Sequence, residues 1–136
     1  NIIKLINLSE NYNVSELVDN SLAKNKRKTI TILNENNFAQ EDCILISRIF
    51  LQKLKRLIKI QSDIQNNNKN IESAIISYKP PIFWKEKEII KNQIKMLSFK
   101  KLEELLIKTN KIEYLIKKNP NISLNIITDF ILEQAI

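Results

Sequence analysis

Few residues in this chain could carry out covalent chemistry. It holds no histidine, no glycine and a single cysteine, Cys43. Without histidine, the commonest general base and metal ligand is absent, and without glycine neither a P-loop nor a dinucleotide fingerprint can form. The adjacent carboxylates Glu103 and Glu104 follow two lysines, and we interpret them as a solvated helix face. The sequence therefore predicts a protein that is not an enzyme by itself and uses no cofactor or metal.

Basic side chains repeat at helical spacing in two places. The first row falls on one face of a predicted helix and consists of Arg48, Lys55 and Lys59. The second recurs every four residues on a later helix and consists of Lys87, Lys91 and Lys95. The formal net charge is +7, which suits an acidic partner such as nucleic acid. Two interpretations stay open: the rows meet phosphate, or they are solvated faces in a sequence rich in the Lys, Asn and Ile of AT-rich codons.

Aromatic residues surround the Pro80–Pro81 break, and lysines stand between them. Rings stack on bases while lysines hold phosphates, so this pattern is typical of single-stranded nucleic-acid contacts. The alternative, which the residue types alone favour, is that Phe83 and Trp84 close the core at a helix start. We expect one of the two rings to be buried and the other at least partly exposed. The candidate DNA contacts are Phe83, Trp84, Lys85, Lys87 and Lys91, and the candidate basic face is Arg48, Lys55 and Lys59.

All of these residues fall on predicted helices or at their ends. Hairpin turns depend on glycine, so its absence favours an all-α fold. The clearest helix runs from about Glu41 to Gln65. Its apolar residues recur at a spacing of 3.6 and must face a core: Ile46, Phe50, Leu54, Leu57 and Ile64.

Caps and breaks divide the rest of the chain into shorter elements. An apolar stretch over residues 1–8 stops at Ser9, and Ser15 then has the character of an N-cap for a helix to about Asn25. The segment around Ile30 is a short helix or, because of its β-branched residues, a strand. Further helices are expected after caps at Asn70, Ser98 and Ser123 and over about 83–97, with Asn119 left-handed before Pro120. The prediction is one compact bundle of about six or seven helices.

The cysteine and the apolar runs bear on the compartment. Cys43 falls at a core position of the long helix, and we expect an inert thiol there. A single cysteine fits a reducing compartment. No segment approaches the roughly 18 apolar residues of a membrane helix. We therefore expect a cytoplasmic protein without membrane contact.

One run of the sequence has a recognisable order of residue types: Tyr78-Lys79-Pro80-Pro81-Ile82-Phe83-Trp84-Lys85-Glu86-Lys87. It resembles a junction in the delta subunits of bacterial DNA polymerase III clamp loaders, above all those of alphaproteobacterial type. Other segments similar to the family follow its order: Leu17–Ala23, Leu54–Leu57, Glu113–Lys117 and Ile126–Ala135. The similarity covers about residues 14–136. In one departure, Lys24 stands where the family usually has glycine.

The resemblance implies a non-catalytic role in DNA replication. Residues 11–136 would form the C-terminal helical collar domain, and residues 1–10 would be the remnant of a preceding domain. Such a collar holds the gamma/tau and delta-prime subunits together, while another delta domain grips the sliding clamp. Primer-template DNA would then be a partner near Phe83. Two rival interpretations stay open: a stand-alone basic helical module that binds nucleic acid, and a generic helical adaptor for protein interactions.

Overall fold

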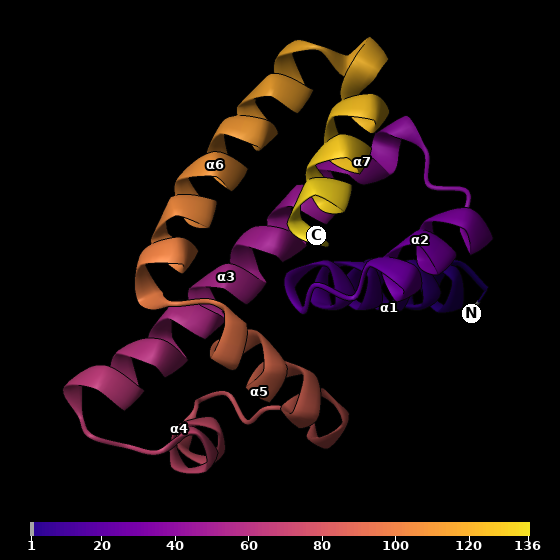
Figure 1. The fold of residues 1–136 in the computed structure, drawn as a ribbon. Helices are drawn as coiled ribbons and strands as arrows, with labels where there is room; N and C mark the ends of the chain where they lie inside the picture. Colours follow the sequence, from indigo (N-terminus) through magenta and orange to yellow (C-terminus); the bar gives the residue numbers. More distant parts are fainter. Residues whose placement is uncertain (1) are drawn as a thin grey trace.

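The computed structural model describes the backbone of residues 2–136 and the side chains from Tyr12 onward. These residues form seven α-helices and no strand (Figure 1): α1 Ile2–Leu22, α2 Lys26–Glu35, α3 Cys43–Asn66, α4 Ile71–Ser77, α5 Lys87–Met96, α6 Phe99–Lys118 and α7 Ser123–Gln134. Three 3-10 turns precede α3, α5 and α7: η1 Gln40–Asp42, η2 Trp84–Glu86 and η3 Pro120–Ile122. The all-α prediction is confirmed. The alternative of a strand around Ile30 is wrong, because this segment is α2.

Helix α3 is the axis of the bundle. Its 24 residues span about 36 Å at 1.5 Å per residue. Figure 1 shows α3 crossing the whole molecule, with α6 running antiparallel along it and α7 folding back from the end of α6. Helices α1 and α2 lie on the other side of α3, and α4 and α5 pack around its C-terminal end. Most elements therefore take their position from one long helix.

The core forms where the apolar stripe of α3 meets its neighbours. The predicted stripe residues Ile46, Phe50, Leu54 and Leu57 are fully buried, and Ile64 is partly buried against them. The Phe50 ring packs on Phe130 of α7, with 4.9 Å between the ring centroids. Within the described residues, no helix combines the length and the apolarity needed to cross a bilayer.

Two of the four predicted helix caps are confirmed and two are wrong. The side-chain oxygen of Asn70 accepts a hydrogen bond from the Ser73 amide at 2.8 Å, and Ser98 caps α6 in the same way. Ser123 does not cap α7. Because η3 leads directly into α7, Ser123 is already helical; its buried hydroxyl donates to the Pro120 carbonyl at 3.0 Å.

The break predicted after Ser9 does not occur. Helix α1 runs through it, and Ser15 lies inside this helix rather than at its start. Polar residues alone do not end a helix, and no proline or glycine interrupts residues 2–22. The side chains of residues 1–11 lie outside the described part of the chain. The assignment of residues 1–10 to a preceding domain therefore stays a prediction.

The backbone conformations of Lys24 and Asn119 differ from those expected for their residue types. Lys24 closes α1 with a φ of 59°, the left-handed region that glycine favours. The amide of Asn25 donates to the Asn20 carbonyl at 3.0 Å, and that of Lys24 to Ser21 at 3.1 Å, which is the Schellman pattern. Asn119, predicted to be left-handed, has a φ of −127°. Pro120 follows it, and the residue before a proline is pushed toward extended conformations.

Candidate functional site

The chain turns sharply between α4 and α5. Pro80 and Pro81 lack amide protons, so neither can continue a helix. After them Ile82 enters the core, whereas Phe83 and Trp84 remain 55% and 68% exposed. The expectation that one of these rings is buried is wrong, and so is the alternative that they close the core. Ile82 occupies the core position instead.

Phe83, Trp84 and Lys85 form what we call the aromatic corner. The centroids of the two rings lie 6.0 Å apart at an interplanar angle of 52°. Lys85 Nζ lies 5.4 Å from the Trp84 ring centroid, within the range of a cation–π contact. The corner thus presents two aromatic rings and a positive charge to solvent, which suits stacking on bases beside a phosphate backbone.

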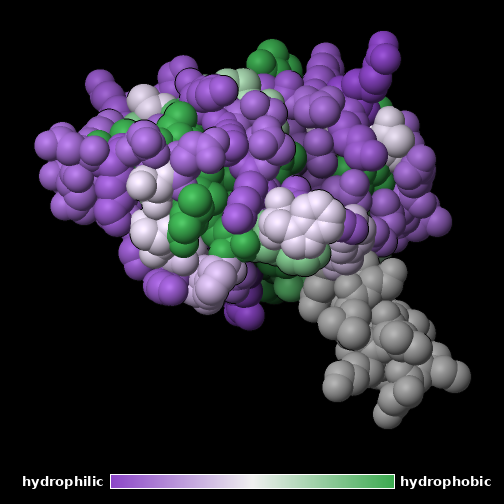
Figure 2. All heavy atoms as spheres, turned by 90° about the horizontal axis from the view of Figure 1, so that it is seen from below, coloured by the Kyte–Doolittle hydropathy of each residue, from purple (hydrophilic) through white to green (hydrophobic). Residues whose placement is uncertain are grey.

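A hollow of about 340 Å³ lies beside the corner, and residues of α1 and α2 form its other side. Phe83 and Lys85 line it from the corner, and Tyr12, Glu16 and Lys28 line it from the two helices. Tyr12 is largely exposed and brings a third aromatic ring to this face. Figure 2, seen from below, shows hydrophobic side chains breaking up an otherwise hydrophilic surface. In the sequence, the one signal for Tyr12 is an aromatic residue within a polar stretch, and it was not among the predicted contacts.

The remaining candidate lysines of α5 differ from one another. Lys87 begins α5 and is half-buried, with no ion pair to any described residue. Lys91 forms ion pairs with Glu72 of α4 and, at 3.4 Å, with Glu88. Its charge is already balanced, and it joins α5 to α4. Lys85 and Lys87 are therefore the better candidates for a phosphate contact.

The basic face predicted on the long helix is present. Arg48, Lys55 and Lys59 are all exposed on the side of α3 that faces away from the core. Arg48 Nε lies 3.5 Å from a Glu113 carboxylate oxygen of α6. Lys59 Nζ lies 5.3 Å from the centroid of the Tyr78 ring, at the end of α4. The basic face therefore reaches the segment that leads into the aromatic corner.

Four charged side chains meet between α1, α3 and η2, and we call them the ion cluster: Asp19, Lys53, Arg56 and Glu86. Both carboxylate oxygens of Asp19 lie 3.1 Å from Lys53 Nζ, which donates to Oδ2. Lys53 Nζ is also 3.5 Å from Glu86 Oε1. Arg56 Nη1 donates to Glu86 Oε2 at 2.9 Å. None of these four residues was predicted as a site from the sequence.

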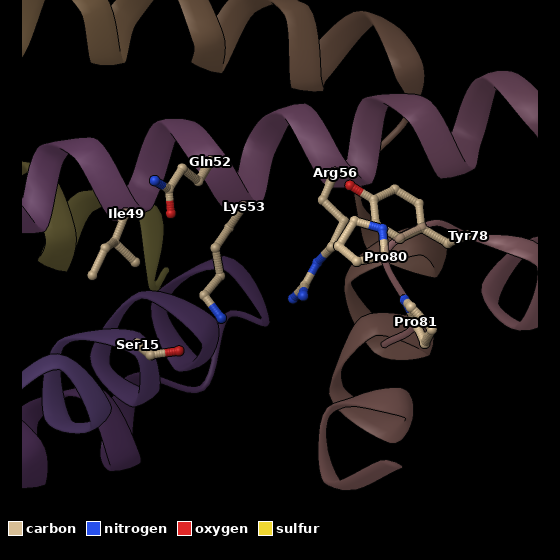
Figure 3. A pocket seen from close by; sticks show the side chains of 8 residues that line it. All are labelled: Ser15, Ile49, Gln52, Lys53, Arg56, Tyr78, Pro80 and Pro81. Carbon is tan, nitrogen blue, oxygen red and sulfur yellow. The ribbon is translucent and has the colours of Figure 1, made fainter. Parts of the chain in front are cut away.

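The ion cluster is largely removed from water. The side chains of Asp19 and Lys53 are no more than 10% exposed. Burial raises the pKa of the Asp19 carboxyl, and the Lys53 ammonium acts in the opposite direction. A hollow of about 310 Å³ lies beside the cluster, between α1, α3 and the Pro80–Pro81 turn. Figure 3 shows Lys53 and Arg56 extending from α3 toward that space.

The Cys43 thiol is fully buried as expected, and burial raises its pKa, so little reactive thiolate forms. Among residues with described side chains, no group of histidine, cysteine and carboxylate side chains could hold a metal ion.

Comparison with known proteins adds no assignment. No protein-family model matches the chain, and searches of curated proteins and of solved structures give no significant match.

Proposed function

We propose that the chain is the collar domain of a clamp-loader delta subunit, which helps to load the sliding clamp onto primed DNA. The observation that carries the proposal is the exposed aromatic corner, within the segment that resembles the family. Lys24 adds support. It departs from the family's glycine in sequence, yet its φ of 59° is a conformation that glycine adopts without strain.

The proposed mechanism is scaffolding. Faces of the bundle would pack against the gamma/tau and delta-prime subunits and so fix the geometry of domains elsewhere in the loader. The chain would hydrolyse no ATP, and the sliding clamp would bind another delta domain. Within the assembled loader, the aromatic corner would face the template strand, with Phe83 or Trp84 stacked on a base and Lys85 beside a phosphate.

The first test is assembly. The chain, mixed with the C-terminal domains of gamma/tau and delta-prime from the same genome, should elute with them in gel filtration at micromolar concentration. Stable interfaces of this kind bury on the order of 1,600 Å². Separate elution of the three proteins would count against the collar assignment.

The second test is DNA binding by the assembled loader. Phe83→Ala or Trp84→Ala should weaken primer-template affinity by about 1–3 kcal/mol, the contribution of one stacked base. Both variants should keep the wild-type melting temperature, because both rings are exposed. Tyr114→Ala, which removes an exposed ring of α6, is the matched control and should leave affinity unchanged.

The exposed basic face of α3 favours a second candidate function, a stand-alone module that binds nucleic acid. In that case the isolated chain should bind single-stranded DNA tightly. The logarithm of its affinity should fall with the logarithm of salt concentration, with a slope of about 0.7 for each phosphate contacted. The collar proposal expects only weak binding by the isolated chain, because one or two stacks do not offset the cost of association.

A further inference from the structure

The aromatic corner is held by its two ends rather than by its own packing. Phe83, Trp84 and Lys85 are all exposed, so their side chains gain little from the core. The residue before them, Ile82, is buried. The residue after them is Glu86, which belongs to the ion cluster. The orientation of the rings therefore depends on how firmly Ile82 and Glu86 are fixed.

Glu86 is attached to the corner through its backbone and to α3 through its side chain. Its amide donates to the Phe83 carbonyl at 2.9 Å, which closes η2. Its carboxylate accepts a hydrogen bond from Arg56 Nη1 at 2.9 Å and lies 3.5 Å from Lys53 Nζ. Both cations belong to α3, and Lys53 is in turn paired with Asp19 of α1. A charge-assisted contact between groups that are mostly buried is stronger than an exposed one.

We propose that Glu86 is a positioning residue, which holds the aromatic corner in one orientation by tying η2 to Arg56 and Lys53. A ring that is already oriented loses less conformational entropy when it binds a partner. The fixed geometry is independent of what the corner binds. Only the expected effect of Glu86 on DNA affinity rests on the proposed function.

The chain's single tryptophan is part of the corner, so the corner can be observed directly. Glu86→Gln keeps the size of the side chain and one acceptor but removes its charge. The matched control is Glu88→Gln, two residues further on, where the side chain is 84% exposed and pairs with Lys91 at 3.4 Å. The readouts are the fluorescence anisotropy of Trp84 and backbone order parameters from nuclear magnetic resonance.

Glu86→Gln should lower the anisotropy of Trp84 and take the order parameters of residues 83–85 from about 0.85 toward 0.6. Glu88→Gln should leave both at wild-type values. Arg56→Gln tests the same link from α3 and should loosen the corner in the same way, which covers the case in which Glu86→Gln fails to fold. Circular dichroism at the measuring temperature identifies the folded variants.

Two results would overturn the proposal. In the first, folded Glu86→Gln and Arg56→Gln keep a corner as ordered as that of Glu88→Gln. In the second, order parameters fall equally in α7, because that would indicate general loosening rather than a local role.

DNA binding separates this inference from the proposed function. Glu86→Gln in the assembled loader should weaken primer-template affinity about threefold or more through lost orientation, while Glu88→Gln should not. If the corner loosens but neither Glu86→Gln nor Phe83→Ala changes affinity, the positioning role holds and the template contact fails. If Phe83→Ala weakens binding while Glu86→Gln leaves the corner ordered, the template contact holds and the positioning role fails.

Discussion

Lys53 Nζ of α3 lies 3.1 Å from the carboxylate of Asp19 in α1, and both side chains are buried. We predict that Lys53→Met destabilises the protein by about 3–5 kcal/mol, because it leaves the Asp19 charge buried without this partner. Urea denaturation measures the change. The control is Lys55→Met, an exposed lysine of the same helix, which should stay within about 0.5 kcal/mol of wild type.

The double variant Asp19→Leu/Lys53→Met shows whether charge is the cause. Apolar side chains of similar volume can replace a buried ion pair with little loss, so the double variant should be more stable than Lys53→Met alone. If the losses in free energy of unfolding caused by the two substitutions instead add up in the double variant, the loss comes from packing and not from an uncompensated charge.

The raised pKa of Asp19 predicts a pH dependence of stability. Its folded-state pKa lies above the ordinary value of 3.8, so between the two values the folded state binds the proton more tightly than the unfolded state does. The resulting contribution to stability is complete below about pH 3.8 and is lost as the pH rises through the folded pKa. Relative to Asp19→Asn, which cannot titrate, wild-type stability should therefore fall with rising pH. The free energies of unfolding of both proteins, measured from about pH 3 to pH 7, give the sign; a relative stability that rises with pH would contradict the prediction.

The left-handed backbone of Lys24 leads us to predict that Lys24→Gly makes the protein more stable. Its left-handed backbone brings its β-carbon close to the following carbonyl, at a cost of about 1–2 kcal/mol that glycine does not incur. Lys24→Gly should therefore stabilise the protein by roughly 1 kcal/mol, somewhat offset by the greater freedom of glycine in the unfolded chain. Lys111→Gly, at an exposed position inside α6, should instead destabilise by about 1 kcal/mol. Thermal melts of both variants make the comparison.

Hydrophobic periodicity and helix caps in the sequence predicted several helices correctly. The stripe from Ile46 to Leu57 identified α3 and its buried face, and Asn70 and Ser98 marked real helix starts. A capping residue with no helix-breaking residue near it gave a wrong helix start. Ser15 has the chemistry of a cap but lies within α1, since nothing nearby ends the helix.

The ion cluster could not be predicted from residue types alone. Lys53 lies three residues after Phe50 and four before Leu57, so it falls on the apolar stripe of its helix. A charged residue in that register was the available signal. Its partners Asp19 and Glu86 are 34 and 33 residues away along the chain, and only the packing of α1 and η2 against α3 brings them together. One of the two rings Phe83 and Trp84 was expected to be exposed; that both are exposed was not predicted, because Ile82 takes the one core position at this turn.

Two phenylalanines give the sharpest contrast between the core and the aromatic corner. Phe50 is fully buried and packs on Phe130 at 4.9 Å, whereas Phe83 is more than half exposed. Phe50→Ala should destabilise the protein by about 3–5 kcal/mol, since it removes buried apolar surface and leaves a cavity. Phe83→Ala removes a ring that water already reaches and should change stability by no more than about 0.5 kcal/mol. Denaturation of the two variants under the same conditions measures both values. A loss at Phe83 as large as that at Phe50 would mean that this ring packs into the core, and the aromatic corner would then no longer be a free binding surface.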